Sequence, residues 1–309
     1  MTHKFTQLQR SLIHITGPDR LSFLQGLITQ DVEKLNPSQS LYSLLLTPQG
    51  RFLYDFFLIP ENASNSSFFL EIDAAFASDL LKRLTLYKLR SEVTLELHSN
   101  LSVCAYWTHR EPIGHTTLFD NVITYQDPRL EELGGRLIAS GSEGHGFLQN
   151  QGFEETSPDD YKSHLLEWGI PTSPHDMIPE KSIPLECGME ELHALSWTKG
   201  CYLGQELTAR THHQGLVRKR LIPGKLEGAE TLPLNARLMY EGEEAGLLRS
   251  SEKGRALALL RLEFLEPALS LKKPFQIRSP KEENQDDSER DLPTTFMPFV
   301  PSWMKILTS

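Results

Sequence analysis

The chain has 309 residues, of which 39% are hydrophobic and 23% are charged. This composition is typical of a folded globular protein and excludes a disordered or collagen-like chain. The 31 Lys and Arg residues are outnumbered by 41 Asp and Glu residues, and the formal charge of −10 means that the protein's field repels phosphate backbones, so we expect no nucleic-acid partner.

No apolar run is long enough to span a bilayer, and residues 1–10 lack the apolar core of a signal peptide, so we expect no membrane partner. The three cysteines, Cys104, Cys187 and Cys201, are too few and too scattered for a disulfide framework. A reducing compartment fits this cysteine usage. We expect a bacterial cytoplasmic protein, with the mitochondrial matrix, and a presequence absent from the chain, as the alternative.

The first half of the chain alternates predicted strands and helices. A strand over 12–15 leads through a Gly-Pro-Asp turn into a helix that places Leu21, Leu24 and Leu27 on one face. Strands over 41–46 and 52–59 are separated by Thr-Pro-Gln-Gly, which is typical of a hairpin turn. Further strands are predicted at 68–72, 93–97, 101–107 and 136–140, with a helix around residues 80–84.

Glycines dominate the sequence after the strand over 136–140. The spacing of Gly141, Gly144 and Gly146 does not match the dinucleotide-binding fingerprint, and no helix pattern follows directly, so we interpret them as a loop. The next helix is well marked. Ser157 is its N-cap, Pro158 occupies the first helical position, and Gly169 lies beyond the last turn.

Short β-like runs broken by glycines begin at residue 221, and they predict a small antiparallel barrel over 221–280. Residues 281–291 contain six acidic side chains and no apolar one, so this stretch cannot repay its ordering entropy. We expect residues 281–309 to be a disordered acidic linker and an apolar tail. The apolar residues 296–307 either dock back on the body or bind a partner.

The most unusual stretch is Lys199-Gly200-Cys201-Tyr202-Leu203-Gly204-Gln205-Glu206. Glycines on both sides of the cysteine allow backbone conformations that turn a thiol outward, and Lys199 and Arg210 favour its thiolate form. By position alone, an unpaired cysteine is more often a small buried hydrophobe. The surrounding residues favour an exposed, reactive or metal-binding sulfur at Cys201.

This stretch, KGCYLGQE, resembles the signature of the YgfZ branch of the glycine-cleavage T-protein superfamily, whose members bind folate and are implicated in iron–sulfur cluster assembly. Four further segments resemble family segments in the same order: residues 15–32, 47–59, 127–137 and 254–261. The continuation ELTARTHHQGLVRKRL is most similar to the mitochondrial-type members, which act late in maturing four-iron clusters. The resemblance implies an α+β, T-protein-like fold with ring-arranged modules over about 1–100 and 101–220, followed by the barrel.

The resemblance also implies a tetrahydrofolate cavity. Asp55 matches a carboxylate that T-proteins use in catalysis or to orient folate, and Glu186 matches a glutamate that pairs with pterin N–H donors. A carboxylate can accept two parallel hydrogen bonds from such a donor edge. The same resemblance assigns Tyr202, Gln205 and Arg210 to cofactor binding, and Lys199, Gly200, Gly204 and Glu206 to the motif.

A two-iron cluster commonly takes four protein ligands, whereas this motif offers the single thiol of Cys201. We therefore expect a [2Fe–2S] cluster that a monomer of this protein shares with a partner, which the resemblance identifies as an A-type scaffold protein. His212 and His213 are candidates for an auxiliary ligand. We expect them on an extended strand, where adjacent residues point to opposite faces and cannot chelate together.

Three functions remain open at this point. The first is a cluster assembly factor that acts through Cys201. The second is a tetrahydrofolate-dependent aminomethyltransferase with Asp55 as its base or orienting acid. This second function is disfavoured because the enzyme branch carries an N-terminal segment that the chain lacks. The third is a folate-sensing binding module without metal chemistry.

Overall fold

The computed structural model describes residues 3–107, 111–215, 217–280 and 290–306. The chain divides into two units, the first formed by Met1–Tyr161 with Met189–Ala209 and the second by Lys162–Gly188 with Arg210–Ser309. The units differ from the predicted modules, since residues 162–188 are grouped with the barrel. None of the described helices combines the length and the apolar character needed to cross a membrane.

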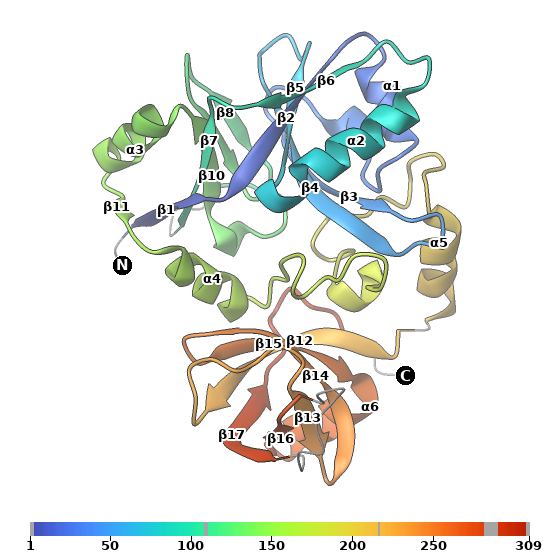
Figure 1. Cartoon of the computed structure of the whole chain (residues 1–309), viewed down its shortest axis with the longest axis vertical. Coiled ribbons are helices and arrows are strands. Elements are labelled where there is room, and N and C mark those ends of the chain that lie inside the picture. The colour runs from blue at the N-terminus through green and yellow to red at the C-terminus, as the bar shows by residue number, and fades with distance from the viewer. Residues whose placement is uncertain (1–2, 108–110, 216, 281–289, 307–309) are drawn as a thin grey trace. The chain divides into compact units, whose positions relative to one another are not determined.

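The first unit contains two sheets (Figure 1). One has the strand order β3 (Leu41–Leu46), β4 (Phe52–Pro60), β5 (Phe68–Asp73), β2 (Arg10–Thr16) and β6 (Thr94–His98). The other has the order β11 (Glu154–Glu155), β1 (Lys4–Leu8), β7 (Ser102–Trp107), β10 (Gly135–Ala139), β9 (Ile123–Gln126) and β8 (Thr116–Leu118). The N-terminal strand β1 therefore pairs with two strands that lie much later in the sequence, β7 and β11.

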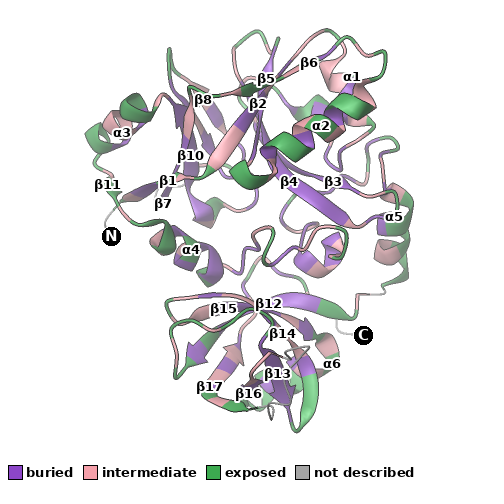
Figure 2. Cartoon of the chain, viewed as in Figure 1, coloured by how far each residue is buried: buried purple, intermediate pink, exposed green. Residues whose placement is uncertain are grey.

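The predicted hairpin is confirmed as β3 and β4, which pair antiparallel across the turn at residues 47–51. All nine residues of β4 are buried, and Figure 2 shows the strand purple along its length. Apolar side chains on both faces explain why the strand reads as a continuous aromatic and aliphatic run rather than an alternating one. Asp55 is the single acid in this strand.

Three helices belong wholly to the first unit: α1 (Arg20–Gln25), α2 (Ala77–Lys88) and α3 (Gly141–Asn150). The helix α3 corrects the prediction of a loop at Gly141, Gly144 and Gly146. A Cβ at Gly144 would lie 2.9 Å from a methyl group of Leu137 on β10, so the glycine permits close packing of this helix on the sheet. Packing overrides the low helix propensity of glycine here.

The second unit contains a closed antiparallel barrel. Its order is β12 (Lys219–Glu227), β15 (Arg255–Arg261), β14 (Glu243–Glu252), β13 (Arg237–Tyr240), β16 (Phe275–Arg278) and β17 (Asp291–Pro298). The predicted barrel is thus present, and it includes β17. The prediction of a disordered tail is wrong for residues 291–306, whose apolar side chains Phe296, Trp303 and Met304 join the barrel core. The predicted linker over 281–289 lies outside the described residues.

The remaining helices are α4 (Pro158–Glu167), α5 (Gln205–Gln214) and α6 (Leu262–Ser270), with short 3-10 turns at Val32–Lys34, Ala74–Phe76, Glu131–Leu133 and Pro184–Cys187. The predicted helix start at Pro158 is confirmed for α4, and Gly169 adopts a φ of +70° after its end. The helix α5 begins at Gln205, inside the cysteine motif and four positions after Cys201.

Candidate functional site

Cys201 is the exposed cysteine among the three, since Cys104 and Cys187 are buried. Burial raises the pKa of the Cys104 thiol to about 12, and burial also raises the pKa of Cys187. The thiolate is the form of cysteine that binds metal. Because burial raises the pKa of both thiols, Cys104 and Cys187 are poor metal ligands at neutral pH. The outward sulfur that the sequence predicts at position 201 is present in the structure.

We call residues 189–204, which contain Cys201, the Cys201 segment. Hydrogen bonds attach this segment to residues 26–31, which follow α1. The Thr29 hydroxyl donates to the Ala194 carbonyl at 2.6 Å, and the Gln30 amide donates to the His193 carbonyl at 2.6 Å. The Ser196 amide donates back to the Thr29 carbonyl at 3.0 Å. The segment is therefore a loop whose backbone is fixed by a neighbouring stretch of the same unit.

Lys199 continues this attachment from within the motif. Its ammonium group donates to the carbonyls of Ile28 and Gln30, at 2.7 and 2.8 Å. The residue is only 8% exposed, and burial lowers its pKa from 10.5 to about 8. The ammonium also lies 5.3 Å from the centre of the Tyr202 ring. These contacts hold the Cys201 segment in place. That Lys199 also favours the thiolate form of Cys201 stays a prediction from the sequence.

Gly204 allows a close backbone approach on the other side of Cys201. Its φ is +82°, and a Cβ there would lie 2.5 Å from the carbonyl oxygen of Thr47 in the β3–β4 turn. Gly50 in that turn also has a positive φ, and its own Cβ would meet the Gly204 carbonyl oxygen at 3.0 Å. The two glycines therefore need each other's small size. Gly200, by contrast, has no atom within 4 Å of an added Cβ.

The other motif residues lie just before α5 or in its first turn. Tyr202 precedes the helix and is buried, and burial raises its pKa to about 12. The Gln205 amide donates to the Tyr202 carbonyl, and Glu206 lies exposed in the first turn, where the helix dipole favours an acid. A buried tyrosine and a helix start thus follow the exposed thiol directly.

Asp55 lies in the same unit, buried at 7% exposure on β4. The Tyr42 hydroxyl donates to one of its carboxylate oxygens at 3.1 Å and also lies 3.8 Å from the sulfur of Met189, the first residue of the Cys201 segment. Burial, and then the negative charge of Asp55, raise the pKa of Tyr42. Tyr42 therefore connects the carboxylate to the start of the segment.

Glu186 and Arg210 belong to the second unit. Glu186 is half-buried in the 3-10 turn Pro184–Cys187. Burial lowers the pKa of Arg249, and the nearby carboxylates of Asp176 and Glu186 oppose that shift. Arg210 is exposed on α5.

The predicted strand at His212 and His213 is wrong, because both residues lie in the last turn of α5. Their rings contact each other edge to face, with centroids 5.3 Å apart. Within the residues that the structure describes, no group of three or more His, Cys, Asp or Glu side chains is arranged to hold a metal ion.

Sequence patterns missed a buried charged group that we call the Glu71 cluster, formed by Glu71, Arg10, Tyr125 and Arg136. Glu71 on β5 has no exposed surface and accepts hydrogen bonds from Arg10 at 2.9 Å, from Arg136 and from the Tyr125 hydroxyl. Glu71 and Arg10 lie on one sheet, whereas Tyr125 and Arg136 lie on the other. The cluster therefore joins the two sheets of the first unit.

Comparisons with known proteins cover both units. The family model described as the CAF17 C-terminal beta-barrel domain matches residues 218–306. The chain is 34% identical to the mouse and human proteins named iron–sulfur cluster assembly factor IBA57, mitochondrial, over 85% of this chain and 78% of each relative. It is 30% identical to the homologue from Pyricularia oryzae, over 98% of this chain and 85% of the relative.

A solved structure confirms the predicted fold. The aminomethyltransferase T of the glycine cleavage system from Bartonella henselae matches with a TM-score of 0.73 over 96% of this chain and 85% of that one. Sequence identity is 14%, so the likeness concerns the fold.

Proposed function

Because the chain belongs to the IBA57 family of iron–sulfur cluster assembly factors, we propose that it takes part in iron–sulfur cluster assembly, with Cys201 as its one ligand to a shared [2Fe–2S] cluster. The cluster is the cargo, and an A-type scaffold protein supplies the remaining ligands. The observation that carries the proposal is the exposed thiol on a fixed segment, with the other two thiols buried. Four ligands are the usual requirement for such a cluster.

The compartment in this proposal is the mitochondrial matrix. The curated relatives are named as mitochondrial proteins, which favours the matrix alternative over the expectation of a bacterial cytoplasm. A monomer with one thiol ligand fits a factor that acts on a partner.

Tetrahydrofolate binding is a separate part of the proposal. In the first unit, the carboxylate of Asp55 accepts a hydrogen bond from the Tyr42 hydroxyl, and the Tyr42 ring packs on Phe57 with centroids 5.0 Å apart. A carboxylate acceptor suits the donor edge of a pterin. Glu186 in the second unit is the other proposed contact, and each acid has its own test. A bound folate would supply a one-carbon carrier, and Asp55 would orient it.

The decisive experiment mixes the full chain with an A-type scaffold protein that carries a [2Fe–2S] cluster. We expect a complex with altered visible absorption and circular dichroism, and we expect Cys201→Ser to abolish it. Cys104→Val is the matched control, because it removes a buried thiol on β7 and keeps an apolar side chain there. Identical complexes with Cys201→Ser would remove the thiol from the mechanism.

Folate binding is measured on its own by titrating tetrahydrofolate into the full chain under anaerobic conditions. We expect Asp55→Asn and Glu186→Gln each to weaken binding about tenfold, as expected for a lost charge-assisted hydrogen bond of about 1.4 kcal/mol. Binding that neither substitution changes would contradict the folate contacts, and it would leave the cluster proposal to its own test.

A further inference from the structure

A cavity of about 510 Å³ lies in the first unit, and none of its lining residues belongs to the Cys201 segment. It is therefore distinct from the site proposed above. Its volume falls in the range of small-molecule pockets in proteins. Both sheets of the unit contribute, with Phe69 on β5 and His98 on β6 from one sheet and Ile123 on β9 and Ile138 on β10 from the other.

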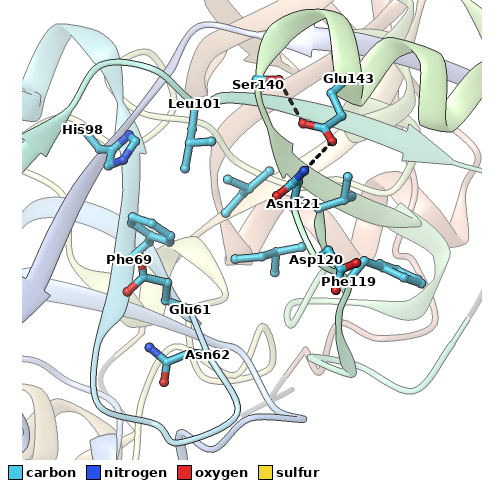
Figure 3. Close-up of a pocket in the computed structure, with 13 residues that line it drawn as sticks. Glu61, Asn62, Phe69, His98, Leu101, Phe119, Asp120, Asn121, Ser140 and Glu143 are labelled. Atoms are coloured by element: carbon cyan, nitrogen blue, oxygen red, sulfur yellow. Dashed lines mark hydrogen bonds between the residues drawn. The ribbon is translucent and has the colours of Figure 1, made fainter.

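The cavity has polar groups on two opposite sides. Figure 3 shows Glu61 and Phe69 on one side, and Phe119, Asp120 and Asn121 on the other. Leu101, Ile123 and Ile138 add apolar surface to the lining. An elongated apolar ligand body with a polar group at each end matches this distribution.

The charge of the lining is entirely acidic, since three of its members are Glu61, Asp120 and Glu143 and none is Lys or Arg. Glu61 accepts hydrogen bonds from the His14 ring at 2.8 Å and from the Ser67 hydroxyl. Glu143 accepts hydrogen bonds from the Ser140 hydroxyl and the Asn121 amide, both at 3.1 Å, and these donors are neutral. The field in the cavity therefore favours a cation and disfavours a phosphate or carboxylate.

We propose that this cavity binds a linear alkyl diamine or polyamine. One ammonium group donates towards Glu61, and the other donates towards Asp120 and Glu143. The methylene stem covers the apolar surface of Leu101. Such a ligand bridges the two sheets and stabilises the first unit without any role for Cys201.

The test uses calorimetric titration of the full chain with putrescine and, in parallel, with butylamine, which has the same stem and one ammonium group. We expect saturable one-to-one binding of putrescine and at least about tenfold weaker binding of butylamine, because one charge-assisted contact of about 1.4 kcal/mol is missing. Equal binding of the two amines, or no saturable binding of putrescine, would overturn the proposal.

Variants locate the site. We expect Glu143→Gln, which keeps an oxygen acceptor for Ser140, to weaken putrescine binding about tenfold. The matched control is Glu266→Gln, an exposed acid of α6 that does not line the cavity. An equal loss with Glu266→Gln would show a response to net charge alone and would overturn the proposed site.

Discussion

Two polar regions of the first unit are held in different ways. Around the Cys201 segment, side chains such as Thr29, Gln30 and Lys199 donate to backbone carbonyls, and the thiol that they position faces solvent. In the Glu71 cluster, charged side chains pair with one another and no surface of Glu71 is exposed. The first arrangement fixes the path of a loop, whereas the second joins two sheets. Substitutions in the two regions should therefore change different properties.

The largest expected effect is in the Glu71 cluster. Glu71→Ala removes the carboxylate that pairs with Arg10 and Arg136, and it leaves Arg136 with the longer contact to Asp127 at 3.5 Å. Breaking a buried ion pair in this way should lower the free energy of unfolding by about 3–5 kcal/mol. Denaturation by urea measures the loss. Glu71→Gln, which keeps the size and an acceptor, should cost less than the alanine. A loss below about 1 kcal/mol for Glu71→Ala would show that the sheets are joined mainly by apolar packing.

The next effect concerns the glycine that shapes the Cys201 segment. Gly204→Ala places a methyl group against the Thr47 carbonyl oxygen at a φ of +82° and should cost about 2–3 kcal/mol. We also expect thiol reagents to modify Cys201 at a changed rate, because the loop must shift. Gly200→Ala is the control, since its new Cβ meets no atom within 4 Å. Equal stability of the two variants would argue against the contact between the motif and the β3–β4 turn.

The smallest effect is a pH dependence at Lys199. Below pH 8 this amine is charged in both the folded and the unfolded chain, because burial lowers its pKa from 10.5 only to about 8. Between pH 8 and pH 10.5 this amine holds more of its proton in the unfolded chain than in the folded chain. The contribution of Lys199 to the free energy of unfolding therefore rises with pH over this range.

The measurement is the difference in unfolding free energy between the unmodified protein and Lys199→Met across that pH range. The difference should grow in favour of the unmodified protein as pH increases, while tyrosines and other amines titrate equally in both proteins. A difference that stays constant with pH would show that the Lys199 ammonium is solvated in the folded chain.

The sequence predicts structure best where local signals determine it. The Ser157 and Pro158 start of α4 and the hairpin of β3 and β4 follow from capping and turn residues and agree with the structure. Local signals mislead at Gly144, whose small size serves packing on Leu137, and at His212, where the motif continues into a helix.

The candidate site shows the same division. The resemblance locates Cys201, and its exposure agrees, but the partners of Lys199 are two carbonyls some 170 positions earlier in the chain. Glu71 and Arg136 are 65 positions apart. No local pattern reports such pairs, because they depend on how the strands of two sheets are arranged.

The closed barrel depends on its C-terminal strand, β17. It pairs with β12 on one side and β16 on the other, and it follows the acidic residues 281–289. A nonsense mutation or a proteolytic cut in that acidic stretch would remove β17 and leave two strands with unpaired backbone groups. Such edges recruit strands from other chains. Loss of the last tenth of the protein would then act as an aggregation mutation, although every residue of the cysteine motif is still synthesised.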